Sequence, residues 1–279
     1  MRIFITGANG QLGHELQQTL VGHDLVLADL PDFDICREES GEQIMSAAPE
    51  VVIHAAAYTD VERAEREVEK VMQVNGEGTG RIARAAAKVG ARLLVISTDY
   101  VFDGTKQTPY LETDRPNPLG AYARSKLEGE HQAMAHCSDA LIVRTAWLYG
   151  RRGKNFVSTV LRKALEQREL RVVADQQGCP THAGDLAAAI ARMIDRELRG
   201  IVHATGSGDC TWYEFACAIV SLAGLAVTVT PITTDQTPLR APRPHYTVLA
   251  NQVLARVGIT LPHWKDALAR FLRQVEAEA

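Results

Sequence analysis

The sequence lacks the features that mark secreted, membrane-embedded or nucleic-acid-binding proteins. Its 279 residues include only five cysteines, an odd number with no CxxC pair, which fits neither a disulfide framework nor a zinc site. The 30 basic and 34 acidic residues are scattered, and no block of five like charges predicts a nucleic-acid surface. No apolar run approaches the length of a bilayer span. We therefore expect buried, reduced thiols, no metal site, no membrane contact and a small molecule as the partner.

The amino-terminal end leaves little room for a targeting segment. After Met1 and Arg2 the chain enters an apolar stretch that ends at Thr6 and Gly7, so the charged and apolar regions of a signal peptide are not predicted. No internal repeat is visible beyond an alternation of short apolar runs and helical patterns. We expect a cytoplasmic protein with an ordinary folded core.

The first half of the chain alternates between short, largely β-branched apolar runs and patterns rich in Ala, Arg and Glu. The spacing of these runs, about 29 residues, is that of a strand–helix repeat. Continuous apolar runs suit a parallel sheet covered by helices on both faces, so we predict a doubly wound, Rossmann-type α/β fold. The expected strands are Arg2–Thr6, Asp24–Ala28, Glu50–Ala55, Ala91–Ser97 and Ala140–Thr145, and the clearest helices are Gln11–Leu20 and Gly76–Lys88.

The alternation weakens after residue 150, and the segment Pro231–Pro244 carries four prolines without periodicity. We predict a dinucleotide-binding domain over residues 1–150, rejoined by about 176–205, and a smaller C-terminal α/β substrate-binding lobe over 151–279. The elements expected here are helices at Phe156–Glu166, His182–Ile194, Trp212–Leu222 and Pro262–Glu276, and strands at Leu170–Ala174 and Ile201–His203.

A glycine-rich turn follows the first expected strand and opens the first helix. Gly7 permits a tight turn, Gly10 lets backbone amides approach a pyrophosphate, and Gly13 lets helix and strand pack closely. The helix N-terminus adds unpaired N–H groups and a positive dipole. The turn, with Gln11 and Leu12 between its glycines, therefore predicts a binding site for NADH or NADPH.

An acidic residue, Asp29, ends the second expected strand, sixteen residues after Gly13. A carboxylate there can accept hydrogen bonds from ribose hydroxyls and repels a 2′-phosphate, which favours NADH over NADPH. Three alternatives stay open: Asp29 can be a solvated loop residue, the neighbouring Asp32 and Asp34 can share its role, and Arg37 nearby can compensate for the charge and admit NADPH. We assign Asp34 and Ile35 to the same cofactor pocket.

The third expected strand ends at His54 and runs into a stretch of small residues. We interpret His54 as a core histidine with satisfied hydrogen bonds and not as a ligand. The small residues after it leave space for a cofactor to cross the sheet. Ala56, Ala57 and Tyr58 are therefore predicted to contact it.

A tyrosine and a lysine, Tyr122 and Lys126, are spaced so that they stack on one face of a helix. The helix follows a strand that ends at Thr98, where a sheet edge presents its chemistry. A carbonyl that receives hydride must gain a proton, and tyrosine is a suitable acid whose pKa a neighbouring ammonium lowers. We predict that Thr98, Tyr122 and Lys126 are catalytic, and that Tyr122 and Lys126 also contact the cofactor.

These motifs resemble those of the extended short-chain dehydrogenase/reductases, and in particular a branch of that family that reduces the 4-keto group of dTDP-4-dehydrorhamnose. The similar stretches are TGANGQLG at Thr6–Gly13, AAAYTDVERAE at Ala55–Glu65, STDYVFDG at Ser97–Gly104, RTAWLYG at Arg144–Gly150, VVADQQGCPT at Val172–Thr181, TWYEFA at Thr211–Ala216 and RPHYTVL at Arg243–Leu249.

The resemblance implies an NADH- or NADPH-dependent reduction that yields dTDP-L-rhamnose, in a pathway that feeds cell-surface polysaccharide. It implies that Tyr122 donates the proton and that Lys126 lowers the pKa of that tyrosine and holds the nicotinamide ribose. It also implies that Thr98 orients the substrate. By the same resemblance, Asp99 and Trp147 contact the sugar, and Arg240 or Arg243 meets the diphosphate.

Two other functions stay open at this point. A sugar-nucleotide epimerase or 4,6-dehydratase of the same fold also uses Tyr and Lys, although a dehydratase of this kind has Asp-Glu after the threonine, where this chain has Asp99 and Tyr100. A non-catalytic NAD(P)-binding regulatory subunit has no need of the three catalytic residues.

Members of the family have been associated with a magnesium-linked dimer held by glutamates. Glu15 matches that pattern, but Gly184 stands where the second glutamate would be, and Asp185 is shifted by one position. We therefore expect no bridging metal, and either a monomer or a homodimer.

Overall fold

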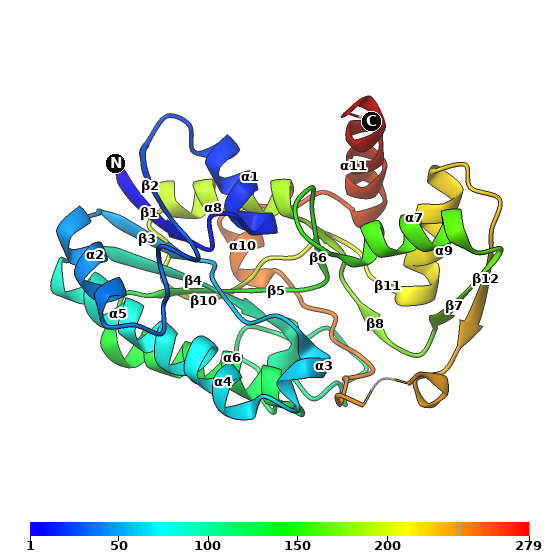
Figure 1. Ribbon diagram of the computed structural model, residues 1–279, viewed down its shortest axis with the longest axis horizontal. Helices are drawn as coiled ribbons and strands as arrows, with labels where there is room; N and C mark the ends of the chain where they lie inside the picture. Colours follow the sequence, from blue (N-terminus) through cyan, green and yellow to red (C-terminus); the bar gives the residue numbers. More distant parts are fainter. Residues whose placement is uncertain (239, 279) are drawn as a thin grey trace.

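A parallel sheet forms the centre of the computed structural model, which describes residues 1–238 and 240–278 (Figure 1). Its strands are β1 (Arg2–Thr6), β2 (Asp24–Ala28), β3 (Val51–His54), β4 (Arg92–Thr98), β5 (Leu141–Thr145) and β10 (Gly200–His203). In the described residues these six strands pair in the order β10-β5-β4-β3-β1-β2, and every pairing is parallel. The strand order reverses between β1 and β3, and it is outside such a switch point that open α/β sheets bind ligands.

Helices cover both faces of this sheet, which confirms the predicted doubly wound α/β class. Successive side chains of a strand point to opposite faces, so Ile3 and Ile5 of β1 pack toward α1 and α8 while Phe4 packs toward α2 and α5. The helices are α1 (Gln11–Thr19) and α8 (Ala183–Asp195) on one face, and α2 (Glu39–Ala47), α5 (Thr79–Lys88) and α6 (Ala121–His136) on the other.

A second, smaller core lies beyond the carboxyl end of the sheet, at the right of Figure 1. It is rich in aromatic residues and includes Tyr149, Phe215 and Phe271. Two of its helices begin with reciprocal capping boxes, at Asn155 and Thr211, which satisfy the free N–H groups of the first turn. Its elements are α7 (Phe156–Glu166), α9 (Trp212–Leu222) and α11 (Trp264–Glu278), with β7 (Glu169–Val173) paired in parallel to β12 (Thr228–Ile232).

Short elements connect the two cores. Two-stranded ladders join β6 (Leu148–Tyr149) to β9 (Thr181–His182) and β8 (Gln177–Gly178) to β11 (Cys210–Thr211). The remaining helices are α3 (Val61–Ala64), α4 (Val68–Met72), α10 (Gln252–Arg256), the π-helix η1 (Gln73–Gly78) and the 3₁₀ turns η2 (Asp99–Val101) and η3 (Thr234–Gln236).

The predicted element bounds agree with the structure to within one or two residues, except at one helix start. The helix expected from Gly76 begins as α-helix only at Thr79, because the preceding residues form the π-helix η1. Within η1 the Asn75 amide donates to the Tyr58 carbonyl (3.0 Å) and to the Ser125 hydroxyl of α6 (2.9 Å). The π-helix thus ties the loop after β3 to α6.

All five cysteines are free thiols, as expected. Cys137, Cys179 and Cys210 are buried, whereas Cys36 and Cys217 are only half-buried. No helix in the part of the chain that the structure describes has both the length and the apolar character needed to cross a membrane.

Candidate active site

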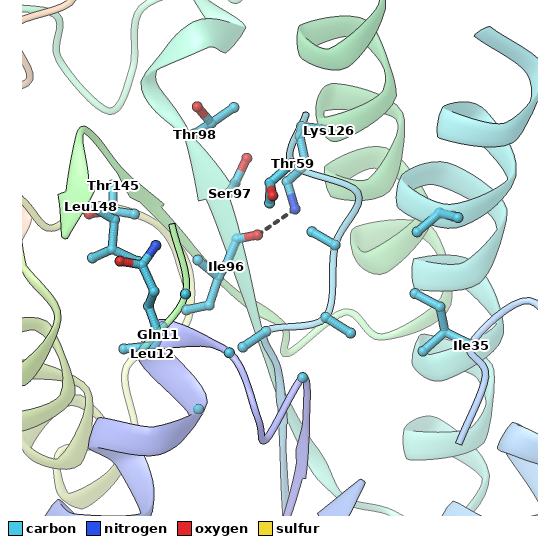
Figure 2. A pocket seen from close by; sticks show the side chains of 18 of the residues that line it. Gln11, Leu12, Ile35, Thr59, Ile96, Ser97, Thr98, Lys126, Thr145 and Leu148 are labelled. Carbon is cyan, nitrogen blue, oxygen red and sulfur yellow. Dashed lines mark hydrogen bonds between the residues drawn. The ribbon is translucent and has the colours of Figure 1, made fainter. Parts of the chain in front are cut away.

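A cavity of about 610 Å³ opens at the carboxyl edge of the sheet, where the strand order reverses between β1 and β3. Figure 2 shows its wall, with residues from the turn after β1, the ends of the central strands and α6 pointing toward one space. The sequence-predicted residues that line it are Gly7, Gly10, Gln11, Leu12, Gly13, Asp29, Asp34, Ile35, Ala56, Ala57, Thr98, Asp99, Tyr122, Lys126 and Trp147.

The glycine turn has the geometry of a pyrophosphate cradle. Gly7 has a φ of 70°, and a Cβ on it would lie 2.6 Å from the Ala56 nitrogen. A Cβ on Gly13 would lie 2.2 Å from the Gly7 carbonyl oxygen, so helix and turn touch backbone to backbone. Gly10 is the N-cap of α1 and offers no side chain to its first-turn N–H groups. The residues present therefore fit a dinucleotide, whose pyrophosphate needs close approach and free amide donors.

Asp29 lines the cavity beside the glycine turn, and its carboxylate already accepts two backbone hydrogen bonds. Its Oδ2 accepts from the Asn9 amide (2.7 Å) and its Oδ1 from the Leu30 amide (2.8 Å). These bonds fix the carboxylate beside the glycine turn. Each oxygen has a second lone pair, so Asp29 can still accept from a ribose hydroxyl.

The loop after β3 enters the site differently from the prediction. Ala56 and Ala57 line the cavity, and so does Thr59, which sequence reasoning missed. Tyr58 does not line the cavity. Its ring packs against α3, α4 and the start of α6, and its hydroxyl donates to Glu67 (3.1 Å). His54 is a core residue as predicted, hydrogen-bonded to Thr6 (2.7 Å) and Thr79 (3.1 Å).

The three predicted catalytic residues meet at the opposite end of the cavity. Tyr122 and Lys126 lie on one face of α6, and the Tyr122 phenol contacts the hydroxyl of Thr98 at the end of β4. The Lys126 Nζ donates to the Ile96 carbonyl (2.7 Å), as Figure 2 shows. The Thr98 hydroxyl donates to Asp99 Oδ1 (3.0 Å). A hydroxyl, a phenol and an ammonium therefore lie together in the cavity wall.

Burial dominates the titration of these groups. It raises the pKa of the Tyr122 phenol, and it lowers the pKa of the Lys126 ammonium to about 8 while the Glu130 carboxylate opposes that change. In the protein alone, desolvation of the phenol outweighs its hydrogen bond to Thr98, and the Lys126 ammonium bonds to the Ile96 carbonyl. That Lys126 and the oxidised nicotinamide lower the tyrosine pKa stays a prediction for the cofactor-bound site.

The predicted sugar contacts, Asp99 and Trp147, are both in the cavity wall. Burial raises the pKa of the Asp99 carboxyl to about 7. Trp147 has a positive φ of 47° and stacks on Trp212 of α9, with ring centroids 3.4 Å apart. A Cβ at position 178 would lie 2.5 Å from the Trp147 ring, so Gly178 makes room for the indole. Sequence reasoning missed both Trp212 and Gly178.

The predicted diphosphate contacts, Arg240 and Arg243, do not line the cavity. The Arg240 amide donates to Glu62 of α3 (3.0 Å), and the Arg243 Nη2 lies 3.2 Å from the same carboxylate. Burial raises the pKa of the nearby Tyr100 phenol to about 12, although the positive charge of Arg243 opposes that change. The glutamate of the TDVERAE stretch therefore holds this arginine segment beside the site and not within it.

Several lining residues were given no role by the sequence, although two of them, Ser97 and Thr145, lie in the family-like stretches. Ser97 and Thr145 end neighbouring strands, and Lys154 adds an exposed cation at the rim. Their position in the sequence could have identified Ser97 and Thr145, since polar residues at the carboxyl ends of central strands lie at the edge of the sheet where ligands bind.

The two positions considered for a metal bridge are engaged elsewhere. Asp185 bonds to Arg270 (2.7 Å), and Glu15 lies 4.0 Å from the Arg151 Nε. Over residues 1–238 and 240–278, no three His, Cys, Asp or Glu side chains gather where they could hold a metal ion.

Known proteins resemble the chain over nearly its whole length. The family model described as the RmlD substrate binding domain matches residues 1–277. A spore coat polysaccharide biosynthesis protein from Bacillus subtilis is 38% identical, covering 98% of this chain and 97% of the relative. A dTDP-4-dehydrorhamnose reductase from Burkholderia thailandensis is 42% identical over 99% of both chains. The crystal structure of a dTDP-4-dehydrorhamnose reductase from Bacillus anthracis in complex with NADP is 39% identical, with a TM-score of 0.95 over 98% of this chain and 99% of that one.

Proposed function

Because the chain belongs to the RmlD substrate binding domain family, we propose that it is a nicotinamide-dependent reductase of a nucleotide-sugar ketone. The proposed reaction reduces the 4-keto group of dTDP-4-dehydro-β-L-rhamnose and yields dTDP-L-rhamnose. Relatives about 40% identical over nearly the full length bear the name of that reductase, and a neighbour of similar identity binds NADP.

One observation carries the proposal: a single cavity joins the glycine turn to Thr98, Tyr122 and Lys126. NADH or NADPH, when bound, supplies the hydride. The turn and the α1 N-terminus hold its pyrophosphate, and Asp29 accepts from its adenosine ribose. The Lys126 ammonium, at the other end, is placed to reach the nicotinamide ribose.

The protein's own part in the chemistry is to bind, orient and protonate. The Tyr122 phenol donates the proton that the new alkoxide needs, and the Thr98 hydroxyl orients the carbonyl oxygen. Burial keeps the phenol protonated until charge develops, since its pKa is raised. Asp99 and Trp147 form the wall that faces the sugar. If the bound substrate drew Arg243 away from Glu62, the Arg243 guanidinium would reach the diphosphate of the substrate. There it could donate two parallel hydrogen bonds to phosphate oxygens.

A dehydratase activity is disfavoured by the residues after Thr98. Elimination of water needs an additional acid–base pair, and the second carboxylate is replaced by the Tyr100 phenol, whose pKa burial raises to about 12. A regulatory subunit has no physical need to assemble a buried phenol, ammonium and threonine at the mouth of a dinucleotide cradle.

The remaining assignments belong to the same proposal. Residues 1–150 with about 176–205 form the cofactor-binding part, and the rest of 151–279 closes the substrate side. We place the enzyme in the cytoplasm, where five free thiols stay reduced, as a monomer or a homodimer.

The test follows oxidation of NADH and of NADPH by the purified protein with freshly prepared dTDP-4-dehydrorhamnose. We expect turnover with at least one cofactor and formation of dTDP-L-rhamnose. Turnover of UDP-glucose or dTDP-glucose in place of this ketone, or no turnover with either cofactor, would overturn the proposal.

A further inference from the structure

A stripe of side chains on α6 contacts consecutive residues of β4. Lys126 and Glu130 lie one helical turn apart. The Lys126 Nζ donates to the Ile96 carbonyl (2.7 Å), and the Ser97 hydroxyl donates to Glu130 Oε1 (2.5 Å). The next residue of β4 is Thr98. Two successive turns of the helix are therefore attached to the two residues that precede the catalytic threonine.

The Glu130 carboxylate is also paired with Arg144 of β5. Both carboxylate oxygens accept from the guanidinium, at 2.9 Å from Nε and 2.6 Å from Nη2. The two side chains are 1% and 2% exposed. Arg144 lies with its guanidinium 5.2 Å from the centre of the Phe102 ring, and its Nη1 is buried without a hydrogen-bond partner. A buried ion pair is weak evidence for stability, because well-packed apolar side chains can match it.

Its position beside the site suggests another role. The titratable groups that face Lys126 from the packed elements are His54 of β3 and, on α6 itself, Tyr122 and Glu130. Burial lowers the pKa of His54 to about 3, so it is neutral, and the buried phenol is neutral too. Asp99, at the end of β4, acts on Tyr122. Among the described residues Glu130 is thus the anion that opposes the desolvation of the ammonium.

We propose that Glu130 is a positioning residue: its carboxylate bridges Ser97 and Arg144, holds α6 in register against β4, and supplies the negative charge that faces the Lys126 ammonium. Arg144 in turn fixes the carboxylate and balances its charge. The effect of Glu130 on turnover rests on the proposed function. Its effect on the charge of Lys126 does not, since that charge can be measured without cofactor or substrate.

The primary test measures the apparent pKa of Lys126 in the protein alone. A small amine-acylating reagent enters the cavity, and the pH dependence of labelling at Lys126 is read by mass spectrometry of its peptide. In Glu130→Gln the pKa should fall by about one to three pH units, because the opposing charge is lost. In Arg144→Met it should rise, because the carboxylate then faces the ammonium alone. Glu130→Asp should keep the charge and remain near the wild-type value.

Glu128→Gln is the matched control, because Glu128 is on the same helix but bonds to Gln132 on the surface. Its labelling profile should coincide with wild type. The proposal is overturned if Glu130→Gln leaves the Lys126 pKa unchanged, or if both charge variants shift it in the same direction. If Glu130→Gln fails to fold, the Arg144→Met variant tests the proposal instead: a raised Lys126 pKa supports it, and a lowered or unchanged Lys126 pKa overturns it.

Turnover gives the second readout. The pH at which kcat/KM falls on the alkaline side should move down in Glu130→Gln by the same amount as the labelling pKa. Wild type without turnover on the sugar nucleotide would contradict the proposed function and leave the labelling test intact. Wild-type turnover with an unshifted alkaline limb in Glu130→Gln would contradict the role of Glu130.

Discussion

The indole of Trp147 stacks on the indole of Trp212, with ring planes 6° apart. Trp147 comes from the segment between β5 and β6 and lines the cavity, whereas Trp212 begins α9 in the second core. The contact fixes a tryptophan whose backbone has positive φ, a conformation that costs energy for a bulky residue. This ring pair is thus one of the contacts through which the second core reaches the candidate site.

Replacing Trp212 by leucine should weaken substrate binding without touching the chemistry. Loss of an aromatic pair removes about 0.5–1.5 kcal/mol, so KM for the sugar nucleotide should rise several-fold while kcat changes little. Steady-state kinetics and a separate NADH titration measure the two effects. Leu222→Ala, an exposed position on the same helix, is the control. A lowered kcat at constant KM would contradict a positioning role for the ring pair.

Removing the phenolic hydroxyl of Tyr122 should abolish turnover. Tyr122→Phe keeps the ring and its packing but has no proton to give, so NADH affinity should stay within a few-fold of wild type. Fluorescence titration measures the NADH affinity, and the activity assay measures turnover. Tyr213→Phe, on α9 away from the cavity lining, should keep full activity. Retained turnover in purified Tyr122→Phe would remove this residue from the mechanism.

Asp29→Ala should change the choice of cofactor. The carboxylate lines the cavity beside the glycine turn. In its proposed role it accepts from a ribose diol and repels a 2′-phosphate, so its loss should weaken NADH more than NADPH. The dissociation constants of NADH and NADPH, measured for wild type and for the variant, show how the preference between the two cofactors changes. Because the Asn9 and Leu30 amides also lose their acceptor, both affinities can fall. A larger loss for NADPH would refute the ribose role.

The sequence was sufficient for the parallel sheet and for the residues that end its strands, because apolar runs and local glycine spacing act over a few residues. It did not predict contacts that depend on the relative placement of distant segments. Arg243 was expected at the diphosphate, and the structure pairs it with Glu62, 181 residues away along the chain. Tyr58 was expected in the cavity, but its hydroxyl bonds to Glu67. The buried pair of Glu130 and Arg144 likewise has no local signature beyond an arginine in an apolar strand.

The close approach of α6 to η1 can be tested at Gly129. A Cβ there would lie 2.3 Å from the Asn75 carbonyl oxygen, a backbone atom that cannot move alone. Gly129→Ala should therefore cost about 1–3 kcal/mol of unfolding free energy, despite the better helix propensity of alanine. Urea unfolding measures this. Gly22→Ala, where nothing lies within 4 Å of the added carbon, should change stability little. Equal effects of the two substitutions would show that the contact carries no strain.

Two buried histidines should make the fold sensitive to acid. Burial lowers the pKa of His54 and of His203 to about 3, from 6.5 for an exposed histidine. The folded state therefore binds fewer protons than the unfolded state between those values, so stability present above pH 6.5 is lost as pH falls toward 3. Each histidine should cost about 2 kcal/mol by pH 5.

The Asp99 carboxyl has a raised pKa, so it adds stability as the pH falls through the same range. It is a single group, whereas the two histidines both remove stability. Urea unfolding at pH 7, 6 and 5 should show a smaller acid loss in His54→Gln than in wild type, even where the variant is less stable at pH 7 for want of its bonds to Thr6 and Thr79. The exposed His131 supplies the control, and His131→Gln should keep the wild-type slope. An unchanged slope in His54→Gln would mean that this histidine is already charged in the folded protein, which its burial between two hydroxyls argues against.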